Sequence, residues 1–264
     1  MSAGSALYTQ ALSRGGALLP EMRTLLRAWI PGEQFQDFAR RITVENTLGR
    51  ATQRTATDYL SAFSRRFVSP ETRPVETLHH LAKGGAGTHQ VFRDVVFFHT
   101  ANVERLLWDF VTGAYWPAAR MGSGSVNADT VRKVIVSAET DGRIRRPWSA
   151  EVHRDLPARV LNAASQFGLL GPGAEGRRPI IAFRPADETI AWFAIDAHVR
   201  GVPDGRIAGM DVWKLFGLAP EVVLDRLAGL HGDRWLDVQR SGEVVRISWL
   251  VDSMEEVIVR VAHE

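Results

Sequence analysis

Residues 42–67, ITVENTLGRATQRTATDYLSAFSRRF, contain the side chains best suited to bind nucleic acid. Arginine, asparagine and glutamine hydrogen-bond to phosphates and base edges, and Asp58 is the only acidic residue between Asn46 and Phe67. The candidate contacts in this block are Asn46, Arg50, Gln53, Arg54, Arg65 and Arg66. An ordinary solvated helix face is the alternative, but the scarcity of acidic residues favours a binding surface.

A second basic cluster is DGRIRRPW, residues 141–148. Arg143, Arg145 and Arg146 stand beside Trp148 there, and Lys133 lies on the preceding helical segment. Guanidinium groups next to an aromatic ring can contact a nucleic-acid backbone or stack on a base. We therefore take these four basic residues as further candidates. A surface loop with Trp148 in the core is an equally good interpretation.

Other chemistries lack the residues that they need. The chain has no cysteine, which excludes disulfides, cysteine-based metal sites and a thiol nucleophile. The eight histidines form no H-E-x-x-H or comparable metal spacing. KGGAGT, residues 83–88, is not a phosphate loop, because Lys83 precedes the glycines instead of following the last one. No G-x-S-x-G occurs. We therefore expect no enzyme, no cofactor and no metal.

Charge is distributed unevenly along the chain. Arginine supplies 29 of the 32 basic residues, which suits bidentate phosphate contacts, although a GC-rich genome would give the same bias. Residues 1–70 carry a net charge of +4, residues 71–125 carry none, residues 126–185 carry +4, and residues 186–264 carry −6. A polyanion should therefore prefer the first and third segments.

The spacing of apolar residues predicts a mainly α-helical protein. Helical patterns fill the first half, and the last of them is a long helix from Thr88 to about Phe110. PAARMGSGSVN, residues 117–127, is the best linker candidate because it is rich in Gly and Ser. We expect a helical domain over residues 1–116 with a helix-turn-helix-like basic block, a basic module over residues 126–185 and an acidic module over residues 186–264.

The element order of both C-terminal modules is typical of winged helices. Residues 188–249 give helices followed by a β-hairpin, for which Ser241-Gly242 is the expected turn. In that register Val238 faces Val245. Residues 128–183 show a similar order, with a weaker hairpin across a Gly-rich loop. The fold class is therefore a helical N-terminal domain followed by winged-helix-like modules with small β-hairpins.

The acidic module, residues 186–264, is poorly suited to binding DNA. Its second helix offers Glu221 and Asp225 where a reader would present arginine, so we expect it to dock a protein partner. Arg177 and Arg178, on the Gly-rich loop of the basic module, give a weak signal for phosphate contact. No apolar run approaches the roughly 18 residues of a membrane helix, and the first residues do not resemble a signal peptide. We expect a cytoplasmic location and no membrane contact.

A family resemblance is carried by four segments: YTQALSRGGALLPEMRTLLRAW, ENTLGRATQRTATDYLSAFSRRF, SQFGLLGPG and ISWLVDSMEEVI. They resemble the BrxA family of BREX phage-defence systems, which was earlier described as an inner-membrane protein family. The resemblance spans nearly the whole chain. It implies nucleic-acid binding, with a suggested similarity to the NusB antitermination protein, an all-helical RNA binder. The resemblance implies no catalytic residues for this chain.

Residues and resemblance together predict a nucleic-acid-binding accessory protein of bacterial phage defence. Double-stranded DNA is the favoured ligand, and RNA remains a variant of the same hypothesis. The competing hypothesis is an interaction scaffold, which docks its acidic module on other defence-system proteins and binds no nucleic acid. Basic side chains gathered on one surface would favour the first hypothesis.

Overall fold

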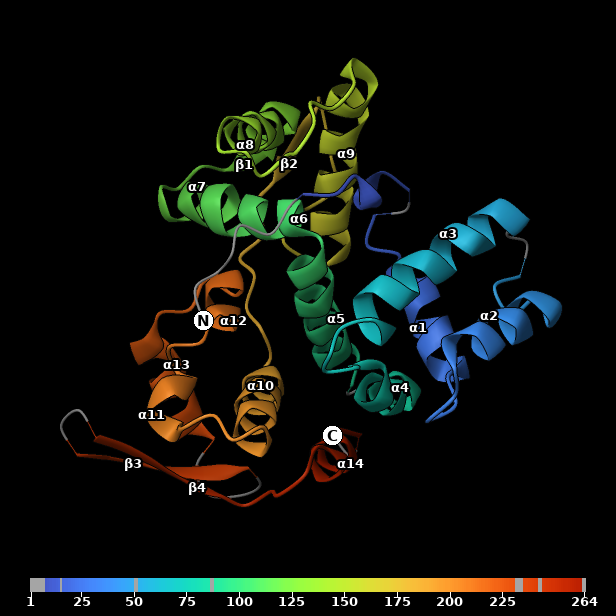
Figure 1. Cartoon of the computed structure of the whole chain (residues 1–264). Coiled ribbons are helices and arrows are strands. Elements are labelled where there is room, and N and C mark those ends of the chain that lie inside the picture. Colours follow the sequence, from blue (N-terminus) through green and yellow to red (C-terminus); the bar gives the residue numbers. More distant parts are fainter. Residues whose placement is uncertain are drawn as a thin grey trace. The chain divides into compact units, whose positions relative to one another are not determined.

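The protein is mainly helical, with two small antiparallel β-sheets in its C-terminal half (Figure 1). The computed structural model describes residues 8–14, 16–49, 52–85, 88–230, 235–241 and 244–262. The chain divides into two compact units. Unit 1 comprises Met1–Pro74 and Val96–Phe183, and unit 2 comprises Val75–Val95 and Arg184–Glu264. The expected boundary at residues 116–126 lies inside unit 1, whereas the one at residues 185–186 lies near the start of the second segment of unit 2.

The first helices of unit 1 enclose an aromatic core. The 3-10 turn η1 (Ala11–Arg14) precedes α1 (Leu19–Ala28), α2 (Phe35–Val44), α3 (Gln53–Phe63) and the π-helical turn η2 (Ser64–Val68). Trp29, Phe38 and Phe63 are almost completely buried. The rings of Trp29 and Phe38 lie 5.0 Å apart, and those of Phe38 and Phe63 lie 5.1 Å apart. This core joins α2, which ends inside the predicted basic block of residues 42–67, and α3, which lies within that block.

The predicted long helix after Thr88 is interrupted. α5 (His89–Val103) ends before Glu104, whose φ of −93° and ψ of 77° are not helical, and α6 (Arg105–Phe110) begins after it. The π-helical turn η4 (Val111–Tyr115) and α7 (Trp116–Arg120) follow. The interruption places the Glu104 carboxylate in the core of unit 1, where its side chain is 1% exposed.

The rest of unit 1 is built around α8 (Ala128–Thr140) and α9 (Ala150–Gln166), which pack against each other (Figure 1). Strand β1 (Ser125–Asn127) precedes α8 and pairs with β2 (Arg177–Pro179), with Val126 opposite Arg178. An isolated bridge between Leu170 and Ile180 closes the Gly-rich loop. The end of the expected linker is therefore a strand that holds this loop beside the two helices.

Unit 2 surrounds one buried helix, α10 (Asp187–Val199). The other elements are α4 (Val75–Lys83), α11 (Asp204–Ile207), α12 (Asp211–Leu215), α13 (Pro220–Gly229), β3 (Leu236–Ser241), β4 (Val244–Trp249) and α14 (Met254–Ala262). Residues Thr189 to Ile195 of α10 are all buried, which explains why this helix shows no polar face. α4 packs against α14, so a segment from the first half of the chain completes unit 2.

The C-terminal hairpin forms, but its predicted register is wrong. Val238 faces Ile247 instead of Val245, and Ser241 faces Val244, so the loop is residues 242–243, which lie outside the described part of the chain. Alternation could not distinguish the two registers, because both keep Val238 and Ile247 on one face. The observed register adds Trp249 opposite Leu236. Asp204 then accepts hydrogen bonds from Ile247 N at 3.0 Å and Trp249 Nε1 at 3.3 Å.

Candidate nucleic-acid interface

Helix α9 presents one buried face and one open face. Ser149 caps its start by accepting a hydrogen bond from Val152 N at 3.4 Å. The buried face packs through Leu156, Val160 and Leu161. The opposite face is exposed and carries the following residues: Arg154, Asp155, Ala158 and Arg159. The sequence patterns did not single out Arg154 and Arg159, because Pro157 in mid-helix obscures which face of this segment is apolar.

Several cations around α9 form no ion pair within the described residues, although Arg159, after Arg154, is one of the charges that lower the pKa of Asp155. Arg145 and Arg146 lie exposed on the loop that enters the helix, and Arg159 lies on its open face. Arg177 is exposed on β2. Within the described residues, none of these four side chains forms an ion pair, whereas Arg154 is paired with Asp155 at 2.8 Å. Unpaired guanidinium groups keep all of their donors available for a phosphate.

Arg178 fixes the Gly-rich loop to α9. Its guanidinium donates to Ser165 Oγ at 2.9 Å and to Asn162 Oδ1. Gly171 N donates to Pro179 O at 2.9 Å, which closes the base of the same loop. Arg178 is therefore half-buried and committed to the protein, whereas its neighbour Arg177 faces solvent.

Arg143 and Lys133 differ in their surroundings. Arg143 is 24% exposed and pairs with Asp109 and, at 2.8 Å, with Asp141. Desolvation opposes its charge, but the hydrogen bond to Asp141 and the nearby acidic groups raise the pKa of Arg143 overall. Lys133 is exposed on α8 and has no ion pair within the described residues. Both line an open groove of about 610 Å³ between η4, α7 and α8.

A second polar surface lies at the start of α3. Thr52 caps this helix by accepting from Thr55 N at 3.2 Å. Gln53 and Arg54 are exposed in the first turn, and Arg54 has no ion pair in the described part of the chain. Asn46 is exposed in the preceding turn with a positive φ of 51°. Arg50 lies outside the described residues.

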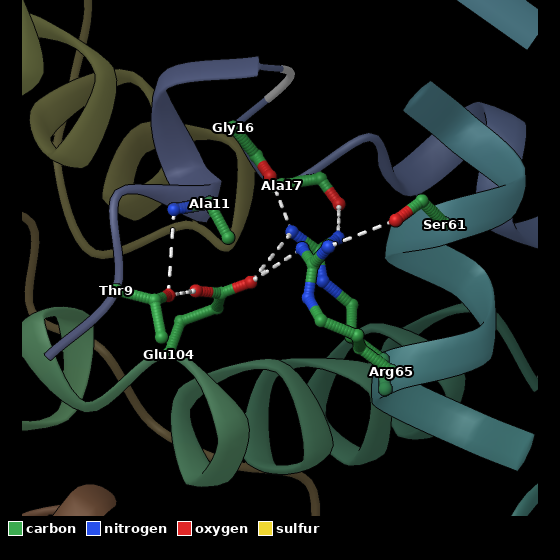
Figure 2. A network of polar contacts seen from close by, with 8 residues as sticks. Thr9, Ala11, Gly16, Ala17, Ser61, Arg65 and Glu104 are labelled. Carbon is green, nitrogen blue, oxygen red and sulfur yellow. Dashed lines mark hydrogen bonds and ion pairs between the residues drawn. The ribbon is translucent and has the colours of Figure 1, made fainter. Parts of the chain in front are cut away.

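The last two arginines of the block turn inward. Arg65 donates to Glu104 Oε1 at 3.1 Å, as Figure 2 shows. Arg66 is 1% exposed and donates to the carbonyls of Gly16 at 2.7 Å and Ala17 at 2.8 Å. Burial lowers the pKa of Arg66 to about 10, which the charge of Glu104 partly opposes. Arg66 is therefore a core residue, and it does not belong to the exposed surface.

The two units carry opposite net charge. Unit 1 has 21 basic and 14 acidic residues, a net charge of +7, and unit 2 has 11 basic and 16 acidic residues, a net charge of −5. Both candidate surfaces, around α9 and at the start of α3, belong to unit 1. In unit 2, Glu221 and Asp225 lie exposed on α13. The cation of that helix, Arg226, is bound to Asp187 and to Pro185 O at 2.9 Å.

Two kinds of site are absent from the described ranges. No helix there combines the length and apolar character that crossing a membrane requires. Among the same residues, no group of three or more histidine or acidic side chains is placed to hold a metal ion.

The fold resembles that of a solved structure, an uncharacterized protein from Magnetospirillum magneticum. The TM-score is 0.55 at 19% sequence identity, and the match covers 72% of this chain and 94% of that one. At this identity the likeness concerns the fold alone. No curated protein matches this chain.

A family model matches a long continuous part of the sequence. The model is BrxA, and it matches residues 6–193. Three of the four segments that resemble this family lie inside the match, and the closing segment ISWLVDSMEEVI lies beyond it. Because residues 6–193 make up well over half of the chain, the chain belongs to the BrxA family.

Proposed function

We propose that this component of a BREX defence system binds duplex DNA through α9 and the loops beside it, as a non-catalytic accessory protein. The observation that carries the proposal is the set of unpaired arginines around one open helix face: Arg145, Arg146, Arg159 and Arg177. They occupy three positions around α9: Arg145 and Arg146 lie on the entering loop, Arg159 on the open face and Arg177 on the closing strand.

The shape of this region supports the same ligand. An α-helix fits the major groove of B-DNA, whereas the major groove of duplex RNA is too narrow for side chains to read. The order β1, α8, α9 and β2 supports the winged-helix-like module that we propose for residues 126–185. In the proposed complex α9 enters the major groove, Arg145 and Arg146 contact phosphates at the helix start, and Arg177 contacts the backbone from the loop held by Arg178.

The start of α3 is a second proposed contact. Asn46, Gln53 and Arg54 are exposed there, and these side-chain types reach phosphates and base edges. Lys133 adds an exposed cation on α8. Arg143 instead supports the surface through its ion pairs, and Arg65 is partly engaged by Glu104.

The test is a salt titration of binding. Fluorescence anisotropy with a labelled DNA duplex, at a series of KCl concentrations, gives the slope of log K against log salt. Replacing both Arg145 and Arg146 with Ala should weaken binding and reduce the slope by about 1.8, since each lost phosphate contact removes about 0.9. The matched control replaces two exposed cations of unit 2, Arg200 and Lys214, with Ala. Equal slopes for the wild type and the loop variant would refute the proposed surface.

RNA and single-stranded DNA of the same sequence separate the ligand classes. Tighter binding of duplex RNA than of duplex DNA would contradict the major-groove proposal.

The scaffold hypothesis rests on a different observation, the acidic surface of unit 2. Glu221 and Asp225 are exposed on α13, and the only arginine of this helix is held by Asp187. This face would repel a duplex and suit a basic protein partner. If no nucleic acid binds at low salt, docking of a defence-system protein on this face becomes the preferred function.

A further inference from the structure

The N-terminal residues 8–14 and 16–18, here called the N-terminal segment, contact the protein at several points, and Tyr8 contacts the loop that precedes α9. Tyr8 N donates to Arg143 O at 2.9 Å, so the backbone of residue 143 is held directly. The Arg143 guanidinium lies over the Tyr8 ring, 5.3 Å from its centroid, and donates to Tyr8 Oη at 3.0 Å. Tyr8 Oη in turn donates to Asp109. Three elements distant in sequence therefore meet around one buried tyrosine.

The same segment is anchored independently at further points along its length. Thr9 Oγ1 donates to Glu104 Oε2 at 3.2 Å (Figure 2). Leu12 is 1% exposed, and η1 packs against α9. Arg66 binds the carbonyls of Gly16 and Ala17, as described above. Because the segment is held by Glu104, by Arg66 of η2 and by α9, Tyr8 has a fixed position from which to hold Arg143.

The loop beyond Arg143 has few anchors of its own. Arg143 N and Ile144 N both donate to Ala138 O, at 2.9 and 3.3 Å. Ile144 is 7% exposed, whereas Arg145 and Arg146 directly after it are exposed and unpaired within the described chain. Residues 143 and 144 therefore set the direction in which Arg145 and Arg146 extend from the protein surface.

We infer that residues 8–14 and 16–18 form a positioning strap, in which Tyr8 and Asp109 hold Arg143 so that Arg145 and Arg146 are ordered before nucleic acid arrives. Arg143, a predicted contact residue, is on this account a positioning residue. The inference rests on the proposed function for its effect on affinity, but the ordering of the loop is a property of the free protein. A loop ordered in advance loses less conformational freedom on binding, and so binds more tightly.

The chemistry of the contact suits a permanent anchor. Burial, followed by the hydrogen bond to Asp109, raises the pKa of Tyr8 well above its usual range. The hydroxyl therefore stays protonated and remains a donor to the Asp109 carboxylate.

A double-mutant cycle tests the strap. Tyr8→Phe removes the hydroxyl and keeps the ring. It should raise the Kd for duplex DNA about fivefold, which corresponds to less free energy than a hydrogen bond to a charged group usually contributes. In a protein that already carries Arg145→Ala and Arg146→Ala, the same change should leave Kd unaltered. Asp109→Asn should repeat this pattern. Tyr59→Phe on α3 is the matched control and should have no effect in either background.

Hydrogen exchange of the free protein supplies the second measurement. Tyr8→Phe should accelerate exchange of peptides covering residues 143–148 and leave peptides from α2 and α3 unchanged. An equal loss of affinity in both backgrounds would show a general structural effect and overturn the inference, as would unchanged exchange of the loop. If the wild type binds no nucleic acid, the proposed function fails, and loop exchange alone decides whether the strap orders residues 143–148.

Discussion

Glu104→Gln should destabilise unit 1 more than any conservative change at an exposed carboxylate. Glu104 and Arg66 side chains are each 1% exposed, and their charged groups lie 4.0 Å apart. The same carboxylate accepts from Arg65 at 3.1 Å and from Thr9 at 3.2 Å. Glutamine keeps the shape and can still accept from Thr9, but it removes the negative charge that partly offsets the burial of Arg66.

The expected loss follows from two estimates that agree. Two unit charges 4 Å apart attract by about 4 kcal/mol at an effective dielectric constant of 20. Removing one partner of a buried ion pair costs about 3–5 kcal/mol, because the other charge stays buried without compensation. We therefore expect the free energy of unfolding of unit 1 to fall by about 3–5 kcal/mol.

Urea dependence of hydrogen exchange measures this loss unit by unit, with peptides from α3 and α6 reporting on unit 1. The control is Glu45→Gln, which alters an exposed pair with Arg41 at 3.8 Å and should cost less than about 1 kcal/mol. If Glu104→Gln costs no more than this control, the buried pair contributes little and the reasoning fails.

Three further predictions concern other parts of the chain. Burial raises the pKa of Asp94 above its ordinary value of 3.8, so the folded protein holds this proton more tightly than the unfolded chain. The unfolding free energy of unit 2 should therefore fall as pH rises through the raised pKa. Urea titrations at several pH values should show a weaker pH dependence for Asp94→Asn than for the wild type. Arg54→Ala should reduce the salt slope of duplex binding by about 0.9, and an unchanged slope would exclude the start of α3 from the interface. Asp204→Ala leaves Ile247 N and Trp249 Nε1 without their acceptor, so it should destabilise unit 2 by about 1–3 kcal/mol. Hydrogen exchange of β4 measures this loss, and Asp211→Ala is the control.

Apolar periodicity predicted helices such as α1 and α2 well, because each of these buries one stripe. It could not show where a helix is interrupted. The expected helix from Thr88 to Phe110 stops at Glu104, and this stop places the carboxylate that binds Arg65. The hairpin was predicted from its alternation, yet two registers satisfy the same alternation, and contacts of β4 with the distant Asp204 accompany the observed one.

The candidate site was harder to predict than the fold. Residues 46–67 are basic in sequence, but the carboxylate that binds Arg65 belongs to Glu104, which lies 39 residues after Arg65. Arg66 and Arg65 are adjacent in sequence, but only one is buried, and a π-helical turn that the sequence pattern does not reveal brings both toward Glu104. Conversely, Arg159 became a candidate only after the buried face of α9 was known.

Unit 2 is made of two stretches of chain, and this has a consequence for its synthesis. α4 leaves the ribosome long before α10 and α14 are made, so its buried residues Val75, Leu78 and Leu81 must wait for the C-terminus. A chain that stops near Pro185 would therefore contain α4 without the rest of unit 2, and the apolar face of α4 would be exposed. If such a chain aggregated, the result could not be used to judge whether unit 2 contributes to ligand binding. Genetic separation of the units requires joining residues 75–95 directly to residues 184–264, so neither unit can be obtained by a single cut in the gene.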